Sequence, residues 1–312
     1  NRLLTASEPD DVWSRSYGYD RYGNRYVVST GLDPATGPEP TMPGDFDTAT
    51  NRLAMAGTGY DEAGNQTTYG LYTLVYDAEN RNIAVNESGT PYVTFTYDGE
   101  GRRVKKEVEG VATYYVYDAL GRLAVEYSNQ AATSPGTSYL FTDMLGSVRT
   151  ITNELGIVVE CYDYLPFGRM LDDEVGERGT CYPASADVGY DSRAPQKFTG
   201  KERDSETGLD YFGARYYSGA QGRFITPDWS STPQPVPYAD FSDPQTLNLY
   251  AYVRNNPIGT ADLDGHGFWK KLGNLISYGE WTDDEKELEV RLQKEADELR
   301  AIAQENDLSG LS

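Results

Sequence analysis

The sequence predicts a mainly β protein in which stacked antiparallel hairpins wrap into a β-shell, followed by a short α-helical tail. Three observations lead to this prediction. The 312 residues contain 26 tyrosines against 9 phenylalanines, together with 32 glycines, which is typical of many short strands joined by tight turns. A Tyr-Asp motif recurs through the first part of the chain. After residue 267 the apolar residues change to a helical spacing.

The repeated motif is Tyr-Asp-x-x-Gly-(Asn/Arg), and it predicts a strand–turn–strand hairpin. The aspartate can cap local N–H groups, and the glycine accepts a positive φ. We therefore expect positive φ at Gly23, Gly64, Gly101 and Gly121. A single hairpin cannot bury its own face, so successive hairpins must stack, and the tyrosines are expected to serve packing. The copies are Tyr19–Asn24, Tyr60–Asn65, Tyr76–Arg81 (Asn80 in place of glycine), Tyr97–Arg102 and Tyr117–Arg122, with weaker ones at Thr142–Ser147 and Tyr164–Arg169.

Three segments follow from these patterns. Residues 1–139 hold the Tyr-Asp repeats, interrupted by a Pro- and Gly-rich surface loop at 31–58. Residues 140–266 form a second block, with loop insertions expected at 170–195 and 230–246, and strands are expected to fill most of 60–266. Residues 267–312 form a variable tail. There a capping box at Thr282–Glu285 precedes apolar residues at helical spacing, which predicts a helix over 282–305.

Composition excludes several function classes. The net charge of −22 leaves little room for a basic face, so nucleic-acid binding by this region is not expected. The chain has no run of about 18 apolar residues, so no membrane span is expected. The first 15 residues lack an apolar signal-peptide core, and we interpret the chain as a fragment whose export signal lies elsewhere.

Histidine and cysteine usage narrows the chemistry further. His266 is the only histidine, which excludes a zincin pair and a multi-histidine metal site, and we expect neither a metal nor a cofactor. Cys161 and Cys181 are the only cysteines. They either form one disulfide or remain two free thiols.

The second block carries a long and specific signature: ETGLDYFGARYYSGAQGRFITPD at residues 206–228, then LNLYAYVRNNPIG at 247–259. With the Tyr-Asp repeats, it resembles the YD-repeat proteins of the RHS (rearrangement hotspot) family over residues 17–266, and 140–266 resembles the RHS repeat-associated core of bacterial polymorphic toxins. The resemblance implies a hollow β-shell that the core closes, with a toxin as the C-terminal region.

The same resemblance implies a secreted or cell-surface bacterial protein that acts in bacterial competition. Its implied partners are its own C-terminal effector region and an immunity protein or secretion-system component. The 46 residues after His266 are short for an independent toxin domain, and a truncated C-terminal region is the favoured interpretation. The alternative function is a non-catalytic adhesion or carbohydrate-contacting module, as in the teneurins that share the shell. A third interpretation is a non-functional remnant of a longer repeat array.

The resemblance also implies self-cleavage, so that the protein is at most an autoproteolytic aspartyl peptidase that acts once on its own chain. Two carboxylates that share a proton can activate water and protonate a carbonyl, provided that they lie within about 8 Å of each other. The matching positions are Asp228 and Asp262, and the border would be the bond between His266 and Gly267. Asp264 would face the same side as Asp262 on a strand, and it could replace Asp262 or position the peptide.

The sequence departs from the family pattern at both aspartates. The usual Asp-Pro-x-Gly is replaced by Asp228-Trp-Ser-Ser and by Asp262-Leu-Asp-Gly. The alternative interpretation is therefore that these aspartates cap turns. Arg223 and Arg254 are the candidate cations that would compensate their charge.

Overall fold

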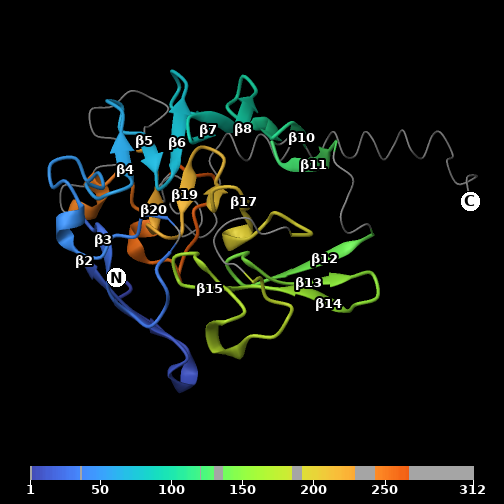
Figure 1. The fold of residues 1–312 in the computed structure, drawn as a ribbon, viewed down its shortest axis with the longest axis horizontal. Coiled ribbons are helices and arrows are strands. Elements are labelled where there is room, and N and C mark those ends of the chain that lie inside the picture. Colours follow the sequence, from blue (N-terminus) through green and yellow to red (C-terminus); the bar gives the residue numbers. More distant parts are fainter. Residues whose placement is uncertain are drawn as a thin grey trace, which may run out of the picture. The chain divides into compact units, whose positions relative to one another are not determined.

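The computed structural model describes residues 2–266, except 36, 120, 130–135, 185–191 and 229–242. Among these residues every pair of strands is antiparallel, as predicted, and the helical segments are short 3-10 turns (Figure 1). The turns are η1 (Pro9–Asp11), η2 (Pro43–Asp45), η3 (Val175–Glu177), η4 (Phe198–Gly200), η5 (Pro244–Leu247) and η6 (Val253–Asn255). Within the described ranges, no helix has the length and apolar character to cross a membrane. The predicted 282–305 helix lies outside the described residues.

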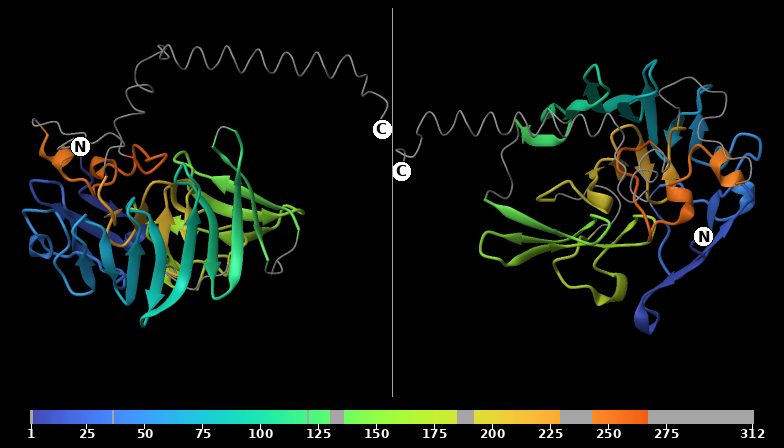
Figure 2. Two further views of the ribbon diagram at one scale, coloured as in Figure 1. Left: turned by 90° about the horizontal axis from the view of Figure 1, so that it is seen from above. Right: turned by 180° about the vertical axis from the view of Figure 1, so that it is seen from behind.

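The Tyr-Asp repeats form two sheets in which the strands follow one another in chain order. The first contains β1 (Thr5–Ser7), β2 (Ser14–Tyr19) and β3 (Arg25–Thr30). The second, here called the repeat wall, has eight strands side by side (Figure 2, left). They are β4 (Thr58–Tyr60), β5 (Gln66–Tyr69), β6 (Tyr72–Tyr76), β7 (Asn82–Glu87), β8 (Thr90–Tyr97), β9 (Arg103–Val108), β10 (Val111–Tyr117) and β11 (Leu123–Ser128).

Each repeat turn is built in the same way. In the turn after β8, Asp98 Oδ1 accepts the backbone N–H groups of Glu100 and Arg102, both at 2.9 Å, and Oδ2 accepts Arg102 Nε at 2.8 Å. Gly101 has a φ of 79°, a conformation that costs any other L-residue free energy. The predicted positive φ is confirmed at all four glycines, and Asn80 takes the same conformation with a φ of 60°.

The motif tyrosines Tyr76, Tyr97 and Tyr117 each join their own hairpin to the preceding one. Tyr97 Oη donates to the backbone oxygen of Asn82 at 2.6 Å, and Tyr117 Oη donates to that of Arg103 at 2.9 Å. The arginine of one turn also stacks on the tyrosine of the next, with Arg81 5.2 Å from the Tyr97 ring. The tyrosines therefore serve packing between hairpins, as the composition indicated.

Three smaller sheets follow the repeat wall along the chain. Their strands are β12 (Ser138–Thr142), β13 (Val148–Asn153) and β14 (Val158–Cys161), then β15 (Asp163–Tyr164) and β16 (Met170–Leu171), then β17 (Glu202–Asp204), β18 (Leu209–Tyr211), β19 (Tyr216–Ser218) and β20 (Arg223–Phe224). We call β17–β20 the core sheet. One hydrophobic cluster joins it to the wall: Leu74, Val85, Val93 and Phe95 pack with Leu209, Tyr216 and Ile225.

A buried ion cluster also connects the wall to the core sheet. Arg103 on β9 has no exposed side-chain surface and pairs with Glu202 at 2.6 Å and with Asp204 at 2.8 Å. Lys106 pairs with Asp204 at 3.1 Å, and Tyr115 Oη donates to Glu202 at 2.6 Å. Burial by itself raises the pKa of Asp204, but Arg103 and Lys106 reverse this and hold that pKa below its usual range. The wall and the core sheet are thus held together by charge pairs as well as apolar contacts.

Three expectations need correction or resolution. Strands do not fill most of 60–266, because after β14 they shorten to two or three residues between turns. The 31–58 loop is anchored rather than purely superficial, since Phe46 and Leu53 form a bridge and are buried. The open question about the cysteines is answered by a disulfide between Cys161 and Cys181, with a Cα–Cα distance of 5.1 Å.

Candidate functional site

Two chain segments bring the predicted aspartates together beside the core sheet. Asp228 follows β20, and its backbone N–H donates to the Leu249 oxygen at 2.9 Å. Asp262 begins the last described turn, which is attached to the loop before β19 because the Ala214 N–H donates to the Asp264 oxygen at 3.0 Å. Both carboxyl-bearing side chains are buried, with Asp228 6% and Asp262 5% exposed.

Arg215 bridges the two carboxylates. Its Nη2 lies 3.2 Å from Asp228 Oδ2 and 3.5 Å from Asp262 Oδ2. Because both oxygens contact one nitrogen, their separation cannot exceed the sum of these distances, which is below the limit of about 8 Å set by a shared water. Arg215 is itself held by stacking on Phe224 at 3.6 Å and by Nε donating to the Gly265 oxygen.

The two aspartates differ in their surroundings. Burial raises the pKa of Asp262, although Arg215 and the backbone N–H groups of Gly265 and Asp264 act against this. Asp262 Oδ1 accepts those N–H groups at 2.8 and 3.2 Å, so one oxygen caps the turn while the other faces Arg215. The raised pKa favours the protonated acid at Asp262, which is the form that can donate to a carbonyl.

We expected Asp264 to face the same side as Asp262 because the two would lie on one strand. Asp264 does not lie on a strand, so this expectation is wrong. Residues 263–266 form a bend, and Asp264 Oδ1 accepts the backbone N–H of His266 at 3.1 Å. The His266 ring points toward the first aspartate, with Nδ1 3.7 Å from Asp228 Oδ1. Asp264 therefore holds the backbone at the predicted border, whose other residue, Gly267, lies outside the described residues.

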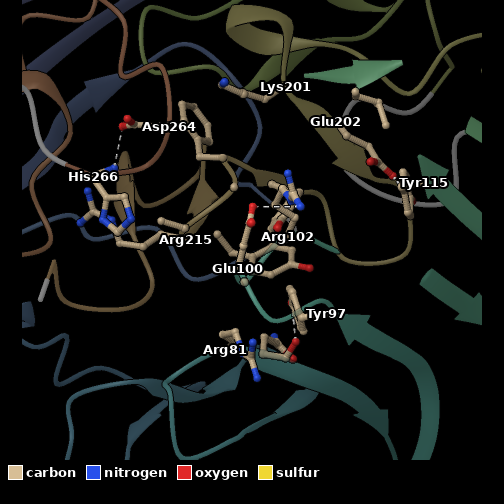
Figure 3. A pocket seen from close by; sticks show the side chains of 18 of the residues that line it. Arg81, Tyr97, Glu100, Arg102, Tyr115, Lys201, Glu202, Arg215, Asp264 and His266 are labelled. Atoms are coloured by element: carbon tan, nitrogen blue, oxygen red, sulfur yellow. Dashed lines mark hydrogen bonds and ion pairs between the residues drawn. The ribbon is translucent and has the colours of Figure 1, made fainter. Parts of the chain in front are cut away.

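A cavity of about 560 Å³ adjoins this site (Figure 3). Arg215, Asp264 and His266 line one part of it, and the repeat turns of the wall line another, through residues such as Arg81 and Arg102. The border residue His266 is thus next to a space large enough for several side chains.

The predicted charge partners are elsewhere. Arg223 is buried among amide and carbonyl oxygens, with Nη2 donating to the Asn51 oxygen at 2.7 Å, and Arg254 pairs with Asp243 at 2.9 Å. The cation that serves the aspartates is Arg215, which sequence reasoning missed. Its only signal was a lone arginine between aromatic residues in the stretch 211–217, and nothing in the spacing connects it to residues 228 and 262.

Comparisons with known proteins agree with this architecture. The family model described as "Teneurin YD-shell" matches residues 113–258. The chain is 32% identical over 293 residues to a protein named tRNA nuclease WapA from Bacillus subtilis, a match that covers 86% of this chain and 12% of WapA. It is 34% identical over 110 residues to toxin subunit YenC2 of Yersinia entomophaga, covering 35% of this chain and 9% of YenC2.

Solved structures show the same fold. The crystal structure of TcdB2–TccC3 without the hypervariable C-terminal region superposes with a TM-score of 0.55 at 20% identity, over 81% of this chain and 13% of that chain. The chain thus spans only a small part of the length of its relatives. The recurrent turns, the antiparallel sheets and these similarities agree: the chain belongs to the RHS/YD-repeat family.

Proposed function

We propose that this chain is the closing part of a YD-repeat shell in a secreted bacterial toxin, and that it cuts itself after His266. The observation that carries the proposal is the meeting of two buried carboxylates, from segments 34 residues apart, at one arginine beside the border. Toxins among the relatives support the scaffold role. The partners would be the protein's own C-terminal effector region and an immunity protein or secretion-system component.

The proposed chemistry assigns one task to each carboxyl group. Asp228, ionised, removes a proton from a water molecule, whose oxygen attacks the carbonyl carbon of His266. Asp262, protonated, donates a hydrogen bond and then its proton to the carbonyl oxygen. The C–N bond to Gly267 breaks as Asp228 passes the proton it took from the water to the nitrogen, while Asp262 takes back the proton from the former carbonyl oxygen. A new carboxyl group and a new amine result, and both aspartates return to their starting forms. Arg215 keeps the two carboxyl groups adjacent, and Asp264 holds the His266 N–H.

Intact mass spectrometry of the refolded full chain tests the proposal. Wild type should separate into a piece that ends at His266 and a piece that begins at Gly267. Asp228→Asn and Asp262→Asn should each slow the cut at least a hundredfold, since Asn keeps the shape but cannot exchange a proton in this way. The matched control is Asp47→Asn, which removes a turn-capping carboxylate far from the site in sequence and should cut at the wild-type rate. A wild-type chain that stays whole over days between pH 5 and 8 would contradict self-cleavage.

One observation favours adhesion as a second candidate. On the outer side of β10 and β11, the rings of Tyr114 and Tyr127 stack at 5.2 Å and remain 36% and 54% exposed. Stacked exposed rings suit contact with the apolar faces of sugars. Retention of the purified protein on immobilised cell-wall polysaccharide, lost in Tyr127→Ser, would support this function. Equal retention of both proteins would remove the argument for it.

A further inference from the structure

We propose that His266 is a positioning residue for the self-cleavage reaction, acting through Asp228, so that protonation of its ring slows the cut. The inference rests on the proposed function and adds a regulatory group to it. The residue whose carbonyl is attacked would then also control the base that activates the water.

The first step of the argument is the placement of the ring. Nδ1 of His266 lies 3.7 Å from Oδ1 of Asp228, and Arg215 contacts the other oxygen, Oδ2, at 3.2 Å. The backbone of His266 is attached to Asp264, and the preceding Gly265 oxygen is attached to Arg215. The backbone that carries the ring is therefore held beside the carboxylate, and half of the side-chain surface of His266 is exposed.

The second step concerns the other charges that face the ring. Arg215 and Asp262 complete the aspartate pair, and the Lys201 ammonium donates to the Leu263 oxygen at 2.7 Å. Across the cavity, Glu79 pairs with Arg81 at 3.2 Å and Glu100 pairs with Arg102 at 2.9 Å. Each of these arginines also pairs with the aspartate of its own turn, Asp77 or Asp98, at 2.8 Å, so each group carries one net negative charge. On the near side, Asp264 accepts the backbone N–H of His266, and Asp228 is the carboxylate that contacts the ring itself. A positive charge that appears on the ring therefore acts most directly on Asp228.

The third step is chemical. Histidine is the residue that changes charge between pH 5 and 8. As an imidazolium, the ring would attract Asp228 Oδ1 and stabilise its ionised form, which makes Asp228 a weaker base toward water. As a neutral imidazole, it would exert no such attraction on the carboxylate. Because exposed ion pairs are weak, the effect on the rate should be about threefold to fivefold rather than an all-or-none switch.

The test compares variants at the same pH, so that the titration of Asp262 cancels. Full-length wild type, His266→Gln and His266→Arg are purified in denaturant, refolded by dilution at pH 5.5 and at pH 8, and followed by intact mass spectrometry. The ratio of the His266→Gln rate to the wild-type rate should be about threefold to fivefold higher at pH 5.5 than at pH 8. His266→Arg carries a permanent charge and should be slower than wild type at pH 8 only.

A rate ratio between His266→Gln and wild type that is the same at both pH values would overturn the role of His266 while leaving self-cleavage intact. No cut in any chain at any pH overturns the proposed function and this inference together. A spectroscopic measurement on the uncut chain is independent of the rate. Because the chain has one histidine, its ring gives a single Cε1–Hε1 cross-peak, and all chains carry Asp262→Asn so that they stay uncut. Relative to Asp262→Asn alone, this cross-peak should move when Asp228→Asn is added and stay in place when Asp47→Asn is added. An unmoved cross-peak in Asp228→Asn contradicts the contact.

Discussion

The repeat wall and the core sheet are both antiparallel, but they are stabilised in different ways. In the wall, each turn satisfies its own polar groups: Asp98 binds residues no more than four positions away. In the core sheet, the polar groups find partners far along the chain, as when Glu202 and Asp204 pair with Arg103. The turns of the wall are therefore stabilised by hydrogen bonds between residues close in sequence. The core sheet depends on contacts between residues distant in sequence, which form only when the whole chain has folded.

The largest expected effect comes from removing the charge that joins the two regions. Arg103→Met would leave Glu202 and Asp204 buried without their main cation, and breaking such a pair costs about 3–5 kcal/mol of unfolding free energy. Urea unfolding measures the loss. The adjacent Arg102→Met is the matched control: this side chain is 32% exposed, and its pairs with Asp98 and Glu100 are worth about 0–1 kcal/mol. Equal losses in the two variants would contradict the distinction between the regions.

The same distinction explains which features the sequence could reveal. The repeat turns and the positive φ at Gly101 could be predicted because the signal lies within six residues. The pair Asp228 and Asp262 came from a resemblance, and Arg215 was missed because it lies 13 and 47 residues from its two partners. Strands were wrongly expected to fill most of residues 60–266, because an aromatic-rich segment can be buried by its neighbours while only two or three of its residues pair as a strand.

The disulfide allows a test of what stabilises the part of the sequence that follows the repeat wall and precedes the core sheet. The strands β15 and β16 have two residues each, so little backbone pairing stabilises this part of the chain. The bond closes a loop with a sequence separation of 20, and closing a loop of this size stabilises by about 3 kcal/mol. Cys161→Ala/Cys181→Ala should unfold at lower urea by that amount. Dithiothreitol should destabilise wild type to the same extent and leave the double variant unchanged; a shift in the double variant would point to another cause.

A smaller effect is expected from a single repeat turn. Gly101→Ala places a side chain at a φ of 79° where no atom lies within 4 Å, so its cost is conformational strain alone, about 1–2 kcal/mol. Gly99, two residues earlier in the same turn, also has open space around it but lacks the positive φ. Gly99→Ala should therefore be neutral or slightly stabilising, since alanine restricts the unfolded chain. Thermal unfolding of the two variants compares them directly, and similar losses would mean that the turn does not require glycine.

The smallest expected effect concerns the tyrosine that joins neighbouring hairpins. Tyr97→Phe keeps the ring, and with it the stacking of Arg81, but removes the hydroxyl that donates to the Asn82 oxygen. The loss should be about 1 kcal/mol, the usual value for one hydrogen bond. Tyr114→Phe, on the exposed outer side of β10, should change the unfolding free energy by only a few tenths of a kcal/mol.

If the motif tyrosine joins hairpins, the loss at position 97 should also appear as faster amide exchange in the strands that follow the two linked turns, β7 and β9, and not throughout the wall. A loss spread evenly over all eight strands would mean that the wall unfolds as one cooperative unit and not hairpin by hairpin.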